Sequence, residues 1–546
     1  MESMLAPGRG ARKEQGGSRS AARRGVPGDA AADDAAAGDA VPGAGTIVWG
    51  PDAPLDPDAA TTAGLLTSDP DTAGPDTAGP AAARVRTRTP DSARPRPRRT
   101  PPAAAVVPLA IEHVAIVACD GSRCIFPDST VLVNAQGVIE RIGESDALDP
   151  YIPREYRRIP GRGRFLMPGL VNLHAHGFSD GALGAFGGPK VRAFHAFRHS
   201  FLGRTARARR DLDFARSMMA EQLAAGVTTV RTGGDMGYEM VALRDAVNAR
   251  EMVGPRIVAS GPTIGTPHDR RTSRRMLDAS TLEAARDSCR RNIEAGVNCL
   301  SLSITADAGD DIDVSELSHV QMTERQIRAV CAEAHRRGLL VAARCLSSQA
   351  VHTALLAGVD IVEHGAALDR ESLRLLRRNP LSLRGWSALV PMLFEAQTRA
   401  TLPQSELGQS DAARANARLV CDGVAKGVRQ ADLADVAIGV GTDSGVTFMP
   451  QYAMWRELDA LVRFGGLTRA QALHCATLQG ARILGIERVT GSIEEGKYAD
   501  LVMLEGNPLR HLRELESPTL VVARGVALWK PRPRRLPELD RMLDVI

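Results

Sequence analysis

Short runs of β-branched and other apolar residues begin after about residue 105 of the chain. The first runs lie at 114–117, 130–133 and 138–143, and a polar stretch at 134–137 that ends in glycine separates the last two. Such a stretch between two apolar runs is typical of a hairpin turn. The pattern therefore predicts a small antiparallel sheet.

Beyond residue 176, apolar runs alternate with longer segments of helical pattern, as in βα units around a parallel sheet. One strand is predicted immediately before His174, and the others are predicted at 227–231, 256–260, 299–302, 339–343, 360–363, 388–390 and 436–440. These eight units fit a (β/α)8 barrel, whose chemistry lies at the carboxyl ends of its strands. Further strands are predicted at 491–504 and 521–525. In the simplest arrangement they pair with the sheet predicted at 111–165.

Four side chains with metal-binding groups fall at predicted strand ends: His174, His176, His364 and Asp443. The side chains of a strand alternate between its faces, so the first two histidines, at positions i and i+2, share one face. A lone histidine at a strand end is more often a structural residue than a ligand. Because all four lie at the carboxyl ends of predicted strands, they could converge on one point at the barrel mouth.

Residues 1–104 are dominated by Ala, Gly, Pro, Asp and Arg. A segment with so few large apolar groups cannot offset the entropy lost on ordering, so we expect a disordered tail. Its arginine-rich run at 84–99 fits a solvated tail better than a contact with an acidic partner.

The net charge of +4 on 546 residues gives no argument for a nucleic acid or a membrane as partner. The eight cysteines form no C-x-x-C pair, which indicates reduced and mostly buried thiols. The start of the chain lacks a signal pattern, and no apolar run is long enough to span a bilayer. We therefore expect a cytoplasmic protein with a small-molecule substrate, and self-association into a homo-oligomer is compatible with this.

Five stretches together resemble the amidohydrolase superfamily of metal-dependent hydrolases, in its prolidase-like and imidazolonepropionase-like branch. They lie at 167–176, 358–365, 441–445, 476–477 and 491–502. The resemblance implies a distorted (β/α)8 barrel at 168–487 and a composite β-sandwich domain from 105–167 and 488–546, after the tail at 1–104. It also implies a divalent metal, with one zinc ion expected, that activates water to attack an amide-like carbon.

Two positions depart from the family pattern. Ser301 stands where relatives place a carboxylated lysine that bridges two metals, and Arg344 stands where they place a histidine. A guanidinium about 4 Å from a divalent ion would be repelled by roughly 8 kcal/mol at an effective dielectric constant of about 20. The sequence therefore disfavours the usual binuclear site.

Two interpretations remain open. In the first, His174, His176 and Asp443 bind one metal, with His364 as a further ligand or proton shuttle and Asp443 as a general base. Arg344 then stabilises an oxyanion or holds a substrate carboxylate. In the second, the metal site has decayed or been repurposed.

His268, in a loop after the third strand, is a further candidate for substrate contact, although a surface loop explains it equally well. An insertion at 177–210, rich in glycine and arginine, could overhang the pocket of an anionic substrate. The predicted function is hydrolysis of an amide-like C–N bond, such as a non-classical peptide or a cyclic amide, in a small substrate. The alternatives are a catalytically silent binding barrel and a decarboxylase, isomerase or cyclase on the same scaffold.

Overall fold

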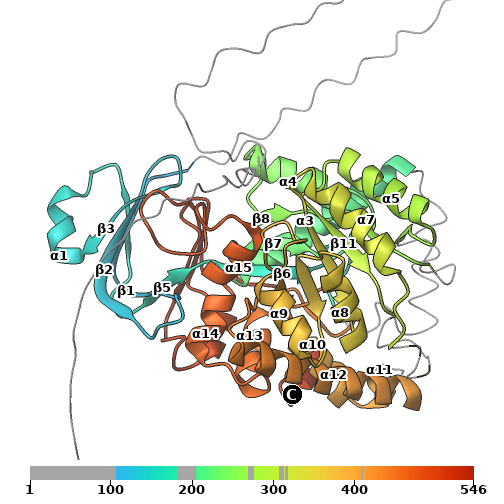
Figure 1. Ribbon diagram of the computed structural model, residues 1–546. Helices are drawn as coiled ribbons and strands as arrows, with labels where there is room; N and C mark the ends of the chain where they lie inside the picture. The colour runs from blue at the N-terminus through green and yellow to red at the C-terminus, as the bar shows by residue number, and fades with distance from the viewer. Residues whose placement is uncertain are drawn as a thin grey trace, which may run out of the picture. The chain divides into compact units, whose positions relative to one another are not determined.

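The computed structural model describes residues 106–181, 204–267, 276–306, 313, 316, 318–407 and 410–546. In this part of the chain the protein has an α/β fold, with one large sheet of mixed direction and two sheets of parallel strands with helices packed against them (Figure 1). The predicted tail at 1–104, His268 and most of the insertion at 177–210 lie outside the described residues.

Strands from both ends of the described chain form the eight-stranded sheet, in the order β17-β16-β15-β5-β1-β2-β3, with β4 paired to β1. Strand β15 runs antiparallel to β5, with Leu501 opposite Pro168, as expected from the sequence. The predicted hairpin is present as the antiparallel pair β2 and β3. The bounds are Leu109–Val117 (β1), Ile125–Val133 (β2), Ile139–Glu144 (β3), Arg157–Pro160 (β4), Phe165–Pro168 (β5), Leu501–Leu504 (β15), Leu520–Ala523 (β16) and Val526–Trp529 (β17).

The parallel strands form a three-stranded sheet, β6-β7-β8, and a six-stranded sheet, β10-β9-β11-β12-β13-β14. Six of the strands predicted beyond residue 176 are present, and the short strands β9 and β10 were not predicted. The bounds are Leu170–Ala175 (β6), Val227–Thr232 (β7), Arg256–Val258 (β8), Thr263–Gly265 (β9), Met276–Asp278 (β10), Cys299–Ser303 (β11), Leu340–Cys345 (β12), Ile361–His364 (β13) and Ala388–Val390 (β14).

Backbone hydrogen bonds connect the two parallel sheets at two places. At the first, Ala259 O after β8 accepts from Asn298 N, which precedes β11, and from Cys299 N in β11. At the other, the segment at 436–444 lies between β14 and β6, because Gly439 N donates to Leu389 O and Leu173 N donates to Val440 O.

The segment at 436–440 was predicted as a strand and is irregular, with one isolated bridge between Leu389 and Ile438. Its glycines explain the irregularity. A Cβ on Gly439 would lie 2.3 Å from Leu173 Cδ1, and one on Gly441 would lie 2.7 Å from His174 Cβ. Glycine allows this close approach of the backbone to neighbouring side chains, at the expense of a continuous strand.

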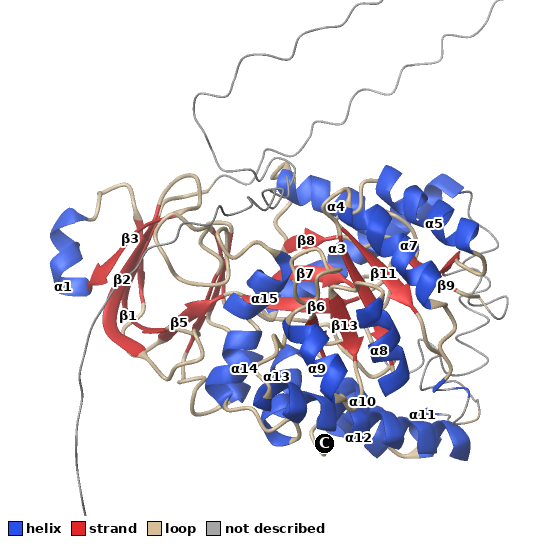
Figure 2. Ribbon diagram, in the orientation of Figure 1, coloured by secondary structure: helices blue, strands red, loops and turns tan. Residues whose placement is uncertain are grey.

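Helices link the parallel strands, and Figure 2 shows helices beside these strands. Helix α7 packs against β12, and helix α8 packs against β12 and β13. Several begin at a side-chain cap: Thr323 and Gln326 form a capping box at the start of α7, and Asp369 accepts from Ser372 N at the start of α9. The bounds are Ser145–Leu148 (α1), Arg204–Ala224 (α3), Glu239–Asn248 (α4), Leu282–Glu294 (α5), Glu324–His335 (α7), Ser348–Leu356 (α8), Arg370–Arg377 (α9), Leu393–Thr401 (α10), Gln404–Leu407 (α11), Asp411–Leu433 (α12), Met454–Arg463 (α13), Arg469–Cys475 (α14), Leu478–Leu484 (α15) and Pro537–Leu543 (α16), with 3-10 turns Asp149–Tyr151 (η1) and Leu512–Glu516 (η3).

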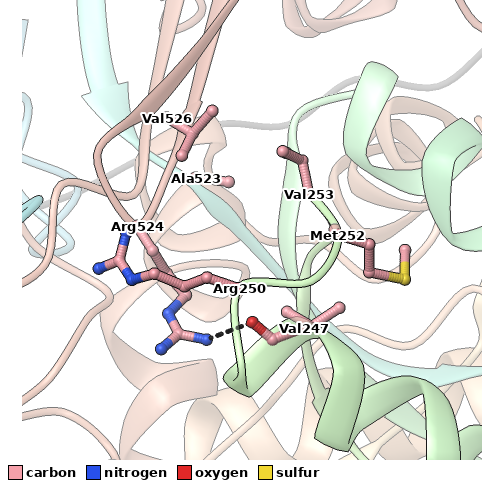
Figure 3. A pocket seen from close by; sticks show the side chains of 8 residues that line it. Val247, Arg250, Met252, Val253, Ala523, Arg524 and Val526 are labelled. Atoms are coloured by element: carbon pink, nitrogen blue, oxygen red, sulfur yellow. Dashed lines mark hydrogen bonds between the residues drawn. The ribbon is translucent and has the colours of Figure 1, made fainter. Parts of the chain in front are cut away.

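The eight-stranded sheet contacts the end of α4 through Arg524, which follows β16. Its Nη1 atom donates to Val247 O at 3.2 Å and to Asn248 Oδ1 at 3.2 Å, beside a small pocket lined by Arg250 and Val526 among others (Figure 3). This contact fixes the sheet against the helix that follows β7, and the pocket contains none of the predicted site residues.

All eight cysteines are free, and seven of them are buried, as expected from the sequence. Burial raises the pKa of Cys289, Cys421 and Cys475 to about 12, so these groups remain neutral thiols at physiological pH. Within the described part of the chain, every helix is too short or too polar to span a bilayer.

Candidate metal centre

Three of the predicted ligands converge on one point. His174 Nε2 lies 3.3 Å from His176 Nε2 and 3.3 Å from Asp443 Oδ1, and His176 Nε2 lies 2.9 Å from the same Asp443 oxygen. All three residues are buried. The two histidines lie at the end of β6, and Asp443 follows the irregular segment at 436–440.

The backbone around these ligands is held by Asn172, which lies on β6. Its Oδ1 atom accepts from the backbone N–H of His174 and of Thr442, and its Nδ2 atom donates to Thr442 Oγ1 at 2.8 Å. This one side chain therefore joins the segments that carry His174 and Asp443. Asp443 itself has a left-handed backbone, with φ of 52°, which is uncommon for a residue with a side chain and frequent at functional sites.

The Nδ1 atom of each histidine donates a hydrogen bond to a group that can only accept one. His174 Nδ1 donates to Glu363 Oε1 at 2.8 Å, and His176 Nδ1 donates to the Gly234 carbonyl at 2.9 Å. In the neutral rings the Nδ1 atoms therefore carry the protons, and the Nε2 lone pairs are left to face each other and Asp443. Metal-binding histidines are oriented in this way in proteins.

Glu363 is itself paired with the guanidinium of Arg231, which comes from β7. Both side chains are almost completely buried, and Arg231 also donates from Nε to Leu173 O at 2.7 Å. A buried carboxylate requires such a partner, because an isolated charge would be strongly destabilised. The arrangement is thus a continuous chain from Arg231 through Glu363 to His174.

The donor set fits a divalent ion. Bonds of about 2.0–2.1 Å to a tetrahedral ion separate neighbouring ligand atoms by about 3.3 Å. The distances among the three atoms of His174, His176 and Asp443 are 3.3, 3.3 and 2.9 Å. Two neutral imidazoles and a carboxylate, with a fourth position left for water or substrate, match the ligands of catalytic zinc sites.

A second group of potential ligands shares Asp443. One ligand atom each from His364, Glu395 and Asp443 lie within 4.8 Å of one another, and all three residues are buried. His364 ends β13 with a left-handed φ of 59°, and its ring centroid is 6.0 Å from that of His174. Glu395 lies in the first turn of α10, after β14.

The electrostatic environment keeps Asp443 charged. Burial raises its pKa, but the positive charge and hydrogen bonds of His174 and His176, in their protonated form without a metal ion, outweigh burial and hold the pKa well below its usual range. Two other carboxyls in this region shift in the opposite direction. Burial raises the pKa of Glu457 to about 8, and burial together with Glu239 raises the pKa of Asp235 well above its usual range.

Ser301 and Arg344, the two residues that depart from the family pattern, both form hydrogen bonds in or near β11. Ser301 Oγ donates to Gly233 O at 3.2 Å. Arg344 Nη2 donates to Ser303 Oγ at 2.8 Å and to Thr305 O at 3.0 Å. The predicted contact of Arg344 with an oxyanion or a substrate stays a prediction, and His268 lies outside the described residues.

Sequence reasoning missed three side chains of this region: Arg231, Glu363 and Glu395. A signal existed for the first two, because a charged residue inside an apolar strand must have a buried partner. Nothing in the sequence indicates that Glu395 and His364 face each other. The carbonyl of Gly234, which orients His176, carries no sequence signal at all.

The chain is similar to several known proteins over most of its length. The sequence model of the amidohydrolase family matches residues 165–528. The ochratoxinase of Aspergillus niger is 24% identical over 433 residues, which cover 74% of this chain and 83% of that protein. The guanine deaminase of Escherichia coli K12 is 24% identical over 417 residues, or 72% of this chain and 86% of that protein. The solved structure of a prolidase candidate from Bifidobacterium longum is 39% identical, has a TM-score of 0.72, and covers 81% of this chain and 99% of that one.

Proposed function

Since the chain belongs to the amidohydrolase family, we propose that it hydrolyses an amide-like C–N bond in a small substrate. The observation that carries the proposal is the convergence of His174 Nε2, His176 Nε2 and Asp443 Oδ1, with no pair more than 3.3 Å apart. These three side chains would hold one divalent ion, for which zinc is our choice. The bound ion would supply a Lewis acid and a water molecule of lowered pKa.

The protein groups have separate roles in this proposal. Glu363 holds the proton on His174 Nδ1 and so keeps the Nε2 lone pair directed at the site. Asp443, whose carboxylate lies beside both histidines at the proposed site, accepts a proton from the attacking water. The proton that Asp443 takes from water is then delivered to the nitrogen of the bond that breaks, which leaves as an amine while the water oxygen bonds to the carbon.

We assign the substrate to small peptide-like amides, with dipeptides that carry a free carboxylate as the first candidates. Support comes from the relative that is named a prolidase candidate, because it covers most of this chain at 39% identity. Arg344, whose guanidinium is held at the end of β11, is the proposed partner of that carboxylate. Cyclic amides are the second class to be tested.

The proposal includes a closed (β/α)8 barrel at 168–487 with a composite β-sandwich domain at 105–167 and 488–546. The backbone hydrogen bonds that connect the two parallel sheets at Ala259 and at Leu389 support closure. The pairing of β15 with β5 supports a domain from both flanks. A cytoplasmic location and a small-molecule partner belong to the same proposal.

The test is an assay of the full chain, stripped of metal and then reloaded with zinc. The panel contains Xaa-Pro and other dipeptides, N-acyl amino acids and cyclic amides, with product amine as the readout. We expect turnover of at least one small amide, lost in His174→Ala and in Asp443→Asn. Binding of these amides without any turnover would instead support a silent barrel, and turnover without uptake of oxygen from water would support a non-hydrolytic enzyme.

A further inference from the structure

The carboxylate of Glu395 lies where it can bind a cation together with two of the predicted site residues. Its oxygen, a ring nitrogen of His364 and an oxygen of Asp443 are all within 4.8 Å of one another. These residues come from three separate segments: the end of β13, the first turn of α10, and the segment after the eighth strand. Such convergence of a histidine and two carboxylates inside a protein is the donor chemistry of a divalent cation site.

The position of Glu395 is fixed by the rest of the fold. The carboxyl group of Glu457, on α13, accepts from Leu393 N at 2.7 Å and from Phe394 N at 2.8 Å, and so caps the first turn of α10. Glu395 also pairs with Arg399 one turn later on the same helix. Both contacts orient the first turn of α10 before any ligand arrives.

Burial makes this arrangement costly unless a cation compensates it. Glu395 and Asp443 are each 5% exposed, so two carboxyl groups lie close together out of water. Like charges at this separation repel strongly in a medium of low polarity. Arg399 offsets part of the charge on Glu395, and its side chain is 21% exposed, so it can swing toward solvent when a cation binds.

Two of the positions that the family pattern uses for a second ion carry other residues in this chain, while His364 is retained. Ser301 and Arg344 occupy those positions and are bonded to the backbone and side chains around β11. A second ion would therefore need an anionic ligand from a different element. Glu395, on the helix after β14, supplies such a ligand.

We propose that His364, Glu395 and Asp443 form a second divalent-cation site, with the Asp443 carboxylate shared between this ion and the ion at His174 and His176. The inference rests on the proposed function because it shares Asp443 with the first site. Carboxylates bridge ions about 3.5–4 Å apart in two-metal sites of hydrolases. The ion would take oxygen and nitrogen ligands, which suits Mn²⁺, Co²⁺ or Zn²⁺.

The experiment titrates the metal-free full chain with Mn²⁺ alone and measures bound ion per chain, first for the wild type and then for two variants. Glu395→Gln removes the proposed ligand at constant side-chain size. Arg399→Gln is the matched control, because it breaks the same ion pair on α10 and leaves the carboxylate in place. We expect two ions in the wild type and in Arg399→Gln, and one ion in Glu395→Gln with the tighter site retained.

A second measurement does not depend on any variant. Two Mn²⁺ ions that share the Asp443 carboxylate give an exchange-coupled electron paramagnetic resonance spectrum in the wild type, whereas one ion gives the spectrum of an isolated Mn²⁺. One ion in the wild type that Glu395→Gln retains would overturn this inference and leave the proposed function standing. A wild-type chain that binds no ion would overturn both.

Discussion

The Nδ1 atom of His174 lies 2.8 Å from Oε1 of Glu363, a residue 189 positions later in the chain. This hydrogen bond connects a predicted ligand to a carboxylate whose other partner is the buried Arg231. It orients the ring of His174 at the end of β6 so that its Nε2 atom is directed at Asp443, as the proposed metal site requires.

Replacing Glu363 by glutamine should weaken metal binding. The amide that Glu363→Gln introduces can keep the hydrogen bond to His174 but carries no charge to raise the basicity of the ring. The loss of such an orienting carboxylate typically weakens metal affinity about 10–100-fold. Competition with a fluorescent chelator measures the change, and an unchanged dissociation constant would show that Glu363 has only a structural role.

The pair formed by Arg231 and Glu363 gives a prediction for stability. Arg231→Met leaves the Glu363 carboxylate buried without its cation, which should cost about 3–5 kcal/mol in the free energy of unfolding measured in urea. The double variant Arg231→Met, Glu363→Leu should recover much of this loss, because an apolar pair of similar size replaces the ion pair. It should not recover metal binding. Recovery of stability and metal affinity together would contradict the role given to Glu363.

Gly233 should be intolerant of a side chain because it packs against the ring of His174. A Cβ at this position would lie 2.1 Å from His174 Nε2, the proposed ligand atom. Gly233→Ala should therefore lower metal affinity by at least about 10-fold. Gly237→Ala is the control in the same loop, where the nearest atom to the new Cβ is the flexible carboxylate of Glu239 at 3.1 Å. Equal metal binding by both variants would show that the ring of His174 can move without consequence.

His474, on α14, makes the stability of the fold depend on pH. Its Nδ1 atom donates to Cys119 O, in the loop after β1, and burial lowers its pKa, with a smaller effect from Arg482 that Asp120 opposes. The folded protein thus binds fewer protons at this site than the unfolded chain does. The contribution of His474 to the free energy of unfolding is fully present above the pKa of about 6.5 that histidine has in the unfolded chain. It is lost as the pH falls through the lower pKa of His474 in the folded protein. Urea denaturation between about pH 8 and pH 5 should show a steeper loss in the wild type than in His474→Gln, and identical slopes would refute the assignment.

The pattern of apolar and polar residues predicted much of the fold. It did not predict the buried charged side chains around the candidate metal site. The runs at 227–231 and 388–390 became β7 and β14, and the order of motifs placed His174, His176 and Asp443 at one end of the parallel strands. The apolar run at 436–440 placed Asp443 beside these histidines, although that segment is irregular in the structure, where glycines let neighbouring side chains approach.

The missed residues depend on contacts between distant parts of the chain. Arg231 and Glu363 occupy separate apolar runs, and only their pairing in space explains two charges that are almost fully buried. Glu395 was missed because a helix begins there after β14, and no periodicity tells which neighbour its first turn faces. Ser301 and Arg344 were identified as departures from the family pattern, yet the groups they contact at β11 follow only from the three-dimensional structure.

An anomalous-scattering map from crystals of the zinc-loaded full chain shows whether His174, His176 and Asp443 hold a metal ion. We predict a zinc peak at about 2.0–2.2 Å from His174 Nε2, His176 Nε2 and an oxygen of Asp443. A map that has no peak among these three atoms, while the protein is folded and zinc is in excess, would contradict the account.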